Sequence, residues 1–221
     1  MSKLIAICGG SGSGKTVLAT ALAKSLGSHQ VCLVSEDAYY RDFSSLGSLV
    51  DGLNFDKAEA KDLDQLRLDL TALKFGSSVK KQHYCMKTRI RSTLDETIEP
   101  KEFVVVEGIH VLNHALRDLF DLTVFIDTPH HIRLARRIIR DVGTRGRKMS
   151  KVVDTYMRNV LPAYDSEIKG YEAFADICLK DLCSDIVSPA KCMETDFISA
   201  SVARIIDQLD DSSSSLTAVS A

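Results

Sequence analysis

The stretch GGSGSGKT, residues 9–16, combines flexible backbone, one cation and one hydroxyl in an order that suits phosphate binding. Its spacing is that of a P-loop, in which backbone N–H groups wrap a polyphosphate because glycines leave them unobstructed. A helix starting at the end of the loop would add the partial positive charge of its N-terminus. We therefore predict a nucleoside polyphosphate site that uses the whole loop: Gly9, Gly10, Ser11, Gly12, Ser13, Gly14, Lys15 and Thr16.

Two side chains of this loop have distinct roles in P-loop chemistry. Lys15 would reach the β and γ phosphates of ATP, and the Thr16 hydroxyl would ligate Mg²⁺. The second half of such a site is a carboxylate at the end of another buried strand. The run FVVVEG supplies Glu107 there, where Asp is the commoner residue. We therefore predict ATP and Mg²⁺ as cofactors, with Thr16 and Glu107 as the metal ligands.

A further carboxylate follows the apolar run VCLVS, where the chain continues as EDAYYRD. An Asp at a strand end commonly forms a turn or caps a helix. A kinase, however, needs a carboxylate that accepts or orients the proton of the acceptor hydroxyl, and α/β sheets bind ligands beyond the carboxyl ends of their strands. Asp37 is therefore the candidate base.

Arginines gather in RLARRIIRDVGTRGR, residues 133–147. Arg133, Arg137 and Arg140 share one helical face, and the Gly-containing turn after them could hinge, so residues 129–150 are predicted to form a closing lid. Arginine binds phosphate oxygens bidentately and would neutralise charge during phosphoryl transfer. A solvated basic face is the plain alternative.

The elements that must position these residues alternate between strands and helices. KLIAIC, VCLVS, FVVVEG and LTVFID are apolar runs typical of strands buried on both faces of a parallel sheet. The predicted fold class is α/β, with the P-loop NTPase fold, because helical stretches separate these strands. Helices are expected over residues 15–26, 57–74, 129–141, 150–168 and 195–209.

The chain is expected to form one kinase domain over residues 1–209. The polar, β-leaning segment at about 78–98 lacks helical periodicity and predicts a hairpin inserted in that domain. Residues 210–221 are Ser-rich and are expected to be a disordered tail.

Composition excludes several classes of partner. The 28 Lys and Arg residues are balanced by 30 Asp and Glu residues, so neither nucleic acid nor a membrane surface is expected as a partner.

The six cysteines form no CxxC pair, which argues against disulfides and zinc. The apolar run before the P-loop is too short for a signal peptide or a membrane span, so a cytoplasmic location is predicted.

Motifs of other P-loop classes are absent from the sequence. GTPases carry a base-reading N-K-x-D and transporter-type ATPases carry L-S-G-G-Q, and this chain has neither. A small-molecule kinase remains, with a nucleotide-binding regulator that does not catalyse as the alternative from a different class.

The P-loop followed in order by SEDAYYRD, NFDKAEA, VVVEGI, VFIDTP and RRIIRDVGTRGR resembles the uridine/cytidine kinases of the phosphoribulokinase and uridine kinase group, over residues 4 to 180. The resemblance implies transfer of the ATP γ-phosphoryl group to the 5′-hydroxyl of uridine or cytidine, with Asp37 taking or orienting the proton. It also implies that Lys15 and Arg137 assist catalysis and that Arg140 and Arg145 clamp the donor phosphates. The acceptor pocket it implies comprises Asp37, Tyr40, Asp56, Gln82, Tyr84, Lys87, Arg89 and Arg137.

The departures from the family pattern fall at the nucleobase end. Lys80, Lys81 and Gln82 stand where the family usually has P-V-Y, Lys87 replaces a His, and Thr155 replaces a Gln. Another nucleoside or a sugar phosphate therefore remains an alternative acceptor, and the three lysines would suit an anionic one. The family often forms tetramers, so a homo-oligomer stays open, although no interface signature is visible.

Overall fold

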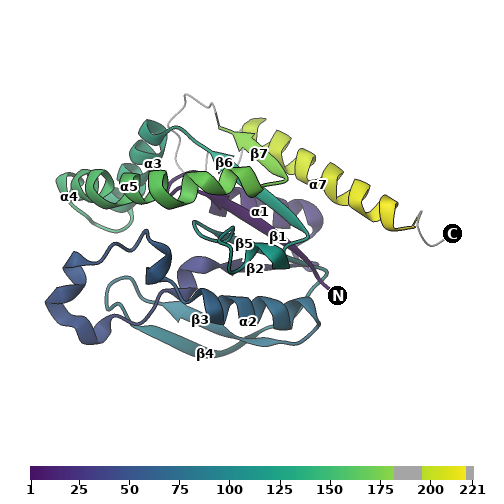
Figure 1. The fold of residues 1–221 in the computed structure, drawn as a ribbon, viewed down its shortest axis with the longest axis horizontal. Helices are drawn as coiled ribbons and strands as arrows, with labels where there is room; N and C mark the ends of the chain where they lie inside the picture. The colour runs from purple at the N-terminus through teal and green to yellow at the C-terminus, as the bar shows by residue number, and fades with distance from the viewer. Residues whose placement is uncertain (182–195, 218–221) are drawn as a thin grey trace.

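A sheet of five parallel strands forms the centre of the computed structural model, which describes residues 1–181 and 196–217 (Figure 1). The strand order is β2-β5-β1-β6-β7, so β1 is central and has neighbours on both sides. The parallel α/β sheet predicted from the sequence is confirmed. The strands are β1 (Lys3–Gly9), β2 (Val31–Ser35), β5 (Phe103–Gly108), β6 (Leu122–Asp127) and β7 (Ile177–Lys180).

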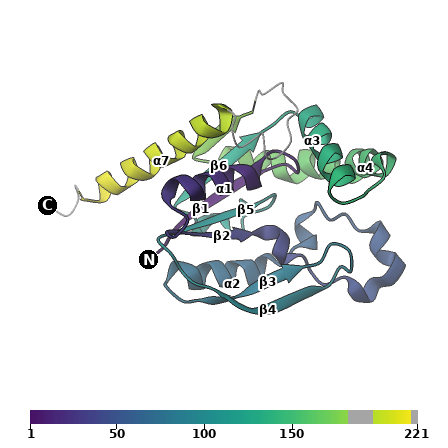
Figure 2. The ribbon, with the colours of Figure 1, turned by 180° about the vertical axis from the view of Figure 1, so that it is seen from behind.

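Side chains of β1 alternate between the two faces of the sheet. Leu4 and Cys8 enter one core, Ile5 and Ile7 enter the other, and all four are fully buried. Helix α2 covers the first face, while α1 and α7 pack together over the second (Figure 2). This two-sided burial explains why the strands are apolar throughout. The covering helices are α1 (Lys15–Leu26), α2 (Leu63–Lys74) and α7 (Asp196–Thr217).

Helix α2 begins later than the helix expected from residue 57. Asp62 caps it by accepting the N–H of Gln65 at 3.2 Å. Before the cap, Lys61 pairs with Tyr40 in a short antiparallel bridge. The expectation of an α-helix over residues 57–62 is therefore wrong, because this backbone pairs with another segment and forms only a 3-10 turn at Ala58–Ala60.

The helical segment from residue 149 to residue 174 changes its hydrogen-bond pattern several times. Pro162, which has no N–H to donate, lies between two π-helical turns, and such turns are frequent near functional sites. The segment expected to be helical from 150 to 168 is helical throughout. This segment follows α3 (His130–Gly143). It consists of α4 (Met149–Thr155) and then of α5 (Leu161–Ala163) between π turns at Tyr156–Val160 and Tyr164–Ile168. A 3-10 stretch at Lys169–Phe174 comes after it.

A two-stranded antiparallel hairpin, β3 (Val79–Tyr84) and β4 (Arg91–Ile98), lies beside α2, as Figure 1 shows. It confirms the hairpin predicted at about 78–98. Further 3-10 turns lie at Glu36–Tyr39, Ser44–Gly52 and Arg117–Leu119.

The C-terminal helix α7 continues to Thr217, beyond the end at residue 209 expected from the sequence. Residues 210–217 contain neither Gly nor Pro, and Ser costs a helix only a few tenths of a kcal/mol per residue, roughly. Residues 218–221 of the expected tail lie outside the described residues, as do Cys183 and Cys192. Across residues 1–181 and 196–217, no helix is long and apolar enough to cross a membrane.

Candidate active site

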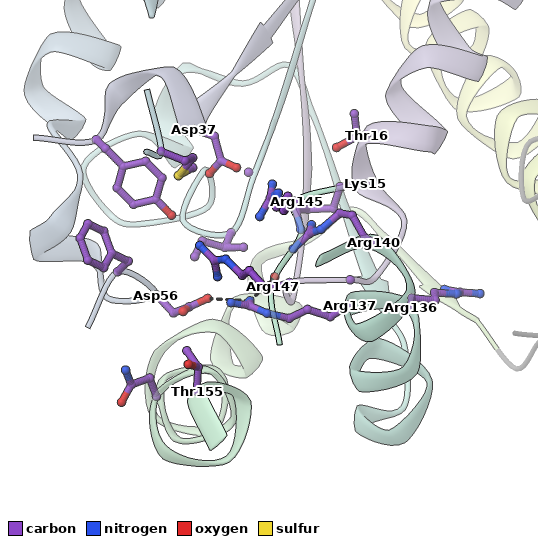
Figure 3. A pocket seen from close by; sticks show the side chains of 18 of the residues that line it. Lys15, Thr16, Asp37, Asp56, Arg136, Arg137, Arg140, Arg145, Arg147 and Thr155 are labelled. Carbon is purple, nitrogen blue, oxygen red and sulfur yellow. Dashed lines mark hydrogen bonds and ion pairs between the residues drawn. The ribbon is translucent and has the colours of Figure 1, made fainter. Parts of the chain in front are cut away.

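A cavity of about 1140 Å³ opens at the carboxyl ends of the central strands (Figure 3). P-loop residues form one part of its wall, and the hairpin and helices α3 and α4 form others. The structure brings together here most of the residues predicted from the sequence: Ser11, Gly12, Gly14, Lys15, Thr16, Asp37, Tyr40, Asp56, Tyr84, Arg89, Glu107, Arg137, Arg140 and Arg145. Gly9, Gly10 and Ser13 belong to the same loop but do not line the cavity.

The P-loop lies on a buried arginine. A Cβ atom added to Gly10 would collide with the Arg133 guanidinium, and one added to Gly12 would lie 2.6 Å from the Arg133 carbonyl oxygen. Arg133 donates through Nε to the Thr128 carbonyl at 3.0 Å and stacks 3.7 Å from the Tyr164 ring centre. Arg133 shares a helical face with Arg137 and Arg140, as expected, but unlike them it packs under the P-loop and does not line the cavity.

Lys15 is 8% exposed, and its Nζ donates to the Gly10 carbonyl at 2.9 Å. Burial lowers its pKa, and the charge of Glu107 acts in the opposite direction. Gly14 just before it adopts φ of 95°, a left-handed conformation that suits glycine and turns the chain into α1. The ammonium is thus held at the base of the loop, where phosphate oxygens of a nucleotide would lie.

Glu107 and Ser35 end two neighbouring strands, β5 and β2, in register. The Ser35 hydroxyl donates to Glu107 Oε1 at 2.7 Å. Burial raises the pKa of Glu107, whereas the Lys15 charge lowers it. Within the described part of the chain, no group of three or more His, Cys, Asp or Glu side chains is arranged to hold a metal ion.

Asp37 lies in the 3-10 turn directly after β2, with its side chain 56% exposed toward the cavity. Its Oδ1 accepts a 2.7 Å hydrogen bond from the Nζ of Lys61, a lysine that is fully buried. Partial desolvation inside the cavity would by itself raise the pKa of Asp37, but the charge and hydrogen bond of Lys61 lower it below its ordinary value. Sequence reasoning missed Lys61, because a lysine in a polar loop is normally exposed.

Aromatic rings form the wall next to Asp37. The Tyr40 ring lies 4.9 Å from the Tyr84 ring and 5.8 Å from the Phe55 ring, measured between centroids. The Arg89 guanidinium lies 6.0 Å from the Phe55 ring. The Tyr84 side chain lines the cavity, and its hydroxyl is buried without a hydrogen-bond partner among the described residues.

A buried carboxylate contacts the arginines of residues 137–147. Asp141 is fully buried and accepts from Arg140 Nε at 2.8 Å. Arg137, Arg145 and Arg147 approach the same carboxylate at 3.6, 3.2 and 3.6 Å. Their charges outweigh burial and lower the pKa of Asp141. Asp141 was not singled out from the sequence, although its place between arginines in RRIIRDVGTRGR was visible.

Arg137 connects helix α3 to both the P-loop and Asp56. Its Nη1 donates to the Ser11 hydroxyl at 2.8 Å and lies 3.7 Å from Asp56 Oδ1. Burial raises the pKa of Asp56, and Arg137 opposes this shift. Arg136, by contrast, points away from Asp37 and binds Asp181 at 2.6 Å (Figure 3).

The lysines and glutamine of the hairpin do not reach the cavity. Gln82 lines a separate small cavity, where its Oε1 accepts from Arg91 Nε at 3.2 Å. Lys87 is exposed in the hairpin turn, Lys80 donates to the Asp95 carbonyl, and Lys81 pairs with Glu96. Gln82 and Lys87, which the resemblance implies for the acceptor pocket, therefore do not line the main cavity in this structure. Gln82 lies two residues back from Tyr84 along β3, which is about 6–7 Å farther from the hairpin tip.

The sequence matches the phosphoribulokinase / uridine kinase family over residues 4–188. A uridine kinase of Ligilactobacillus salivarius is 38% identical over 181 residues, which cover 80% of this chain and 84% of that protein. A uridine kinase of Staphylococcus haemolyticus is 37% identical over 181 residues, covering 80% and 87%. The structure of phosphoribulokinase from Rhodobacter spheroides is similar with a TM-score of 0.63 at 18% identity, covering 85% of this chain and 73% of that one. This last likeness concerns the fold, and it confirms the predicted P-loop kinase fold.

Proposed function

The chain belongs to the phosphoribulokinase / uridine kinase family, and from this premise we propose that it phosphorylates the 5′-hydroxyl of uridine or cytidine. It is an ATP-dependent kinase, and its acceptor is a small molecule. The names of the two relatives support a pyrimidine nucleoside as that acceptor.

One observation carries the proposal: a single cavity is lined both by Lys15 and Thr16 of the P-loop and by Asp37. A nucleotide whose phosphates lie in the loop and an acceptor beside Asp37 would therefore share one enclosed space. Tyr40 and Tyr84 offer aromatic faces to a base, and Asp56 offers a carboxylate to ribose hydroxyls. Holding two reactants in such a space contributes a large part of the rate enhancement of a transferase.

The proposed reaction is an in-line displacement at the γ-phosphorus. The acceptor oxygen forms a bond to the γ-phosphorus, the bond from that phosphorus to the β,γ-bridging oxygen breaks, and ADP leaves with the electron pair. Asp37 accepts the proton of the acceptor hydroxyl. Lys15 and Arg137, with Arg140 and Arg145 on the donor phosphates, neutralise charge as it spreads over the transferred group.

The residues near the P-loop fit a magnesium ion. Mg²⁺ prefers oxygen ligands and binds nucleotides with one or two protein oxygens, the rest coming from phosphates and water. Thr16 and Glu107 supply a hydroxyl and a half-buried carboxylate at the cavity wall, and Lys15 favours the ionised form of Glu107. We propose that these two residues hold Mg²⁺, which would stabilise negative charge on the phosphates when bound.

The structure also favours one alternative acceptor, a sugar phosphate. Besides Arg137, Arg140 and Arg145, four cations of the segment 147–158 line the cavity: Arg147, Lys148, Lys151 and Arg158. Their charge would suit an acceptor that carries its own phosphate.

The proposal treats residues 1–209 as one kinase domain in which residues 129–150 close over the substrates. Arg137 already contacts the P-loop through Ser11, and Asp141 keeps the neighbouring arginines together. A lid of this kind would exclude water from the transferred phosphoryl group.

The test is release of ADP from Mg·ATP in the presence of single acceptors: uridine, cytidine, purine nucleosides and ribulose or ribose phosphates. The proposal predicts rapid turnover on uridine or cytidine and formation of the 5′-monophosphate. Turnover only on a sugar phosphate would show that the acceptor is a sugar phosphate and not a pyrimidine nucleoside. Tight ATP binding with no turnover on any of these compounds would support a regulator and contradict the proposal.

A further inference from the structure

Lys61 is a fully buried lysine in contact with two carboxylates and an aromatic ring. Its Nζ lies 2.7 Å from Asp37 Oδ1, 3.4 Å from Glu36 Oε1 and 3.4 Å from the centroid of the Tyr40 ring. Burying an ammonium group costs on the order of several kcal/mol unless neighbouring groups compensate its charge. The compensation here is specific, because one of the partners is the proposed base.

The backbone fixes the position of Lys61 relative to Asp37. Tyr40 and Lys61 form an isolated antiparallel bridge, flanked by hydrogen bonds from Arg41 N to Ala60 O at 3.0 Å and from Asp62 N to Tyr39 O at 2.8 Å. The bridge thus joins the turn that carries Asp37 to the loop that carries Lys61, at Tyr40, three residues after Asp37. A side chain mounted on such a bridge has little freedom to move away.

Glu36 completes the arrangement from the opposite side. It has no exposed surface, and its Oε2 accepts the backbone N–H of His110 at 2.7 Å. Gly108 leaves room for it, since a Cβ there would collide with the Glu36 carboxylate. Lys61 therefore has one partner that faces the cavity and one that is locked in the core.

We propose that Lys61, held by Glu36, positions Asp37 for catalysis by binding Oδ1 and leaving Oδ2 for the acceptor hydroxyl. This inference rests on the proposed function, because it concerns the same proton transfer. When Asp37 takes the proton, its attraction to Lys61 weakens, and the fixed carboxylate of Glu36 keeps the lysine compensated. Lys61 can thus remain charged through the whole cycle and return Asp37 to the same orientation.

Other charged groups around Asp37 act in both directions. Lys15 and Arg140 favour its ionised form, as Lys61 does. Glu107 and Asp56 interact with it as like charges, and Glu36 lies behind Lys61. Lys61 is the cation that donates a hydrogen bond to the Asp37 carboxylate, so its removal should change both orientation and basicity.

The test uses the double variant Glu36→Gln/Lys61→Met, which removes one buried charge of each sign and keeps similar volumes. Lys57→Met is the matched control, since Lys57 lies in the same segment, is half exposed and contacts only Glu167 among the ion pairs described. We expect kcat to fall about 100-fold in the double variant through misorientation of the base. KM for the acceptor and Kd for ATP should stay within about two-fold of the wild-type values. The acid limb of the pH profile of kcat/KM should move up by about one pH unit.

Two outcomes would overturn the inference. A double variant with wild-type kcat and an unmoved acid limb would show that Lys61 does not act through Asp37. Parallel losses of kcat and ATP affinity would show a structural role only. If wild-type protein turns over no acceptor, the proposed function fails, and carbon-13 NMR of the Asp37 carboxyl then decides the inference: its pKa should rise in the double variant, and an unchanged pKa would refute the contact.

Discussion

Arg137 Nη1 donates a 2.8 Å hydrogen bond to Ser11 Oγ, so the lid helix α3 is joined to the P-loop by one guanidinium. The same nitrogen lies 3.7 Å from Asp56. In the proposed reaction, Arg137 would therefore span the donor and acceptor sites, where charge would develop during phosphoryl transfer.

Replacing Arg137 with Met should impair transfer more than nucleotide binding. We expect kcat/KM for the acceptor to fall about 100- to 1000-fold, since arginines that contact a transferred phosphoryl group contribute at least this much. Kd for ATP should change less than about five-fold, because the P-loop remains. Steady-state kinetics and calorimetric titration of ATP measure the two quantities. Arg204→Met on helix α7 is the control, and equal losses in both quantities would contradict this role of Arg137.

Replacing Asp141 with Asn should loosen the arginine cluster. We expect a loss of about 1–3 kcal/mol in the free energy of unfolding at pH 7, as for a buried charged hydrogen-bond partner. Because the pKa of Asp141 is depressed in the folded protein, its contribution is present above the ordinary carboxyl pKa and is lost as pH falls through the folded value.

Urea denaturation at a series of pH values checks the Asp141 prediction. The difference in the free energy of unfolding between wild type and Asp141→Asn should shrink as the solution is made more acidic. Asp118→Asn is the control, because Asp118 forms an exposed pair with Arg67 and such pairs contribute little. A difference that grows toward low pH would contradict the assigned sign.

Replacing Gly108 with Ala should destabilise the protein without touching any substrate-binding side chain directly. The new Cβ would collide with Glu36, which His110 and Lys61 hold in place. We expect a loss of about 1–3 kcal/mol, the usual cost of overpacking a core. Gly170→Ala is the control, since no atom lies within 4 Å of its added Cβ. Equal stability of the two variants in urea would show that Glu36 can move.

The sequence predicts the position of a residue well where that position depends on local spacing. Gly9 to Thr16 form a loop whose shape follows from the order of their residue types, and Asp37 and Glu107 lie at strand ends that a parallel sheet necessarily brings to one edge. The lid arginines share a helix, so their proximity also follows from periodicity.

The errors arise where position depends on contacts distant in the chain. Lys61 reaches Asp37 through a backbone bridge that no local pattern indicates, and Arg133 turns under the P-loop although it shares a helical face with Arg137. Gln82 was placed in the pocket by its match to a family position, but the hairpin carries it to a different cavity. The helix expected over residues 57–74 begins only at Leu63, because Asp62 caps it there.

The most direct test of the central claim compares Asp37→Asn with wild type in acceptor-dependent ADP release from Mg·ATP. Asp42→Asn, five residues along the same loop and outside the main cavity, is the matched control. We predict that Asp37→Asn loses about 10²- to 10⁴-fold in kcat while binding ATP with an affinity within about two-fold of wild type, and that Asp42→Asn retains full turnover. Wild-type turnover in Asp37→Asn would contradict its role as the base.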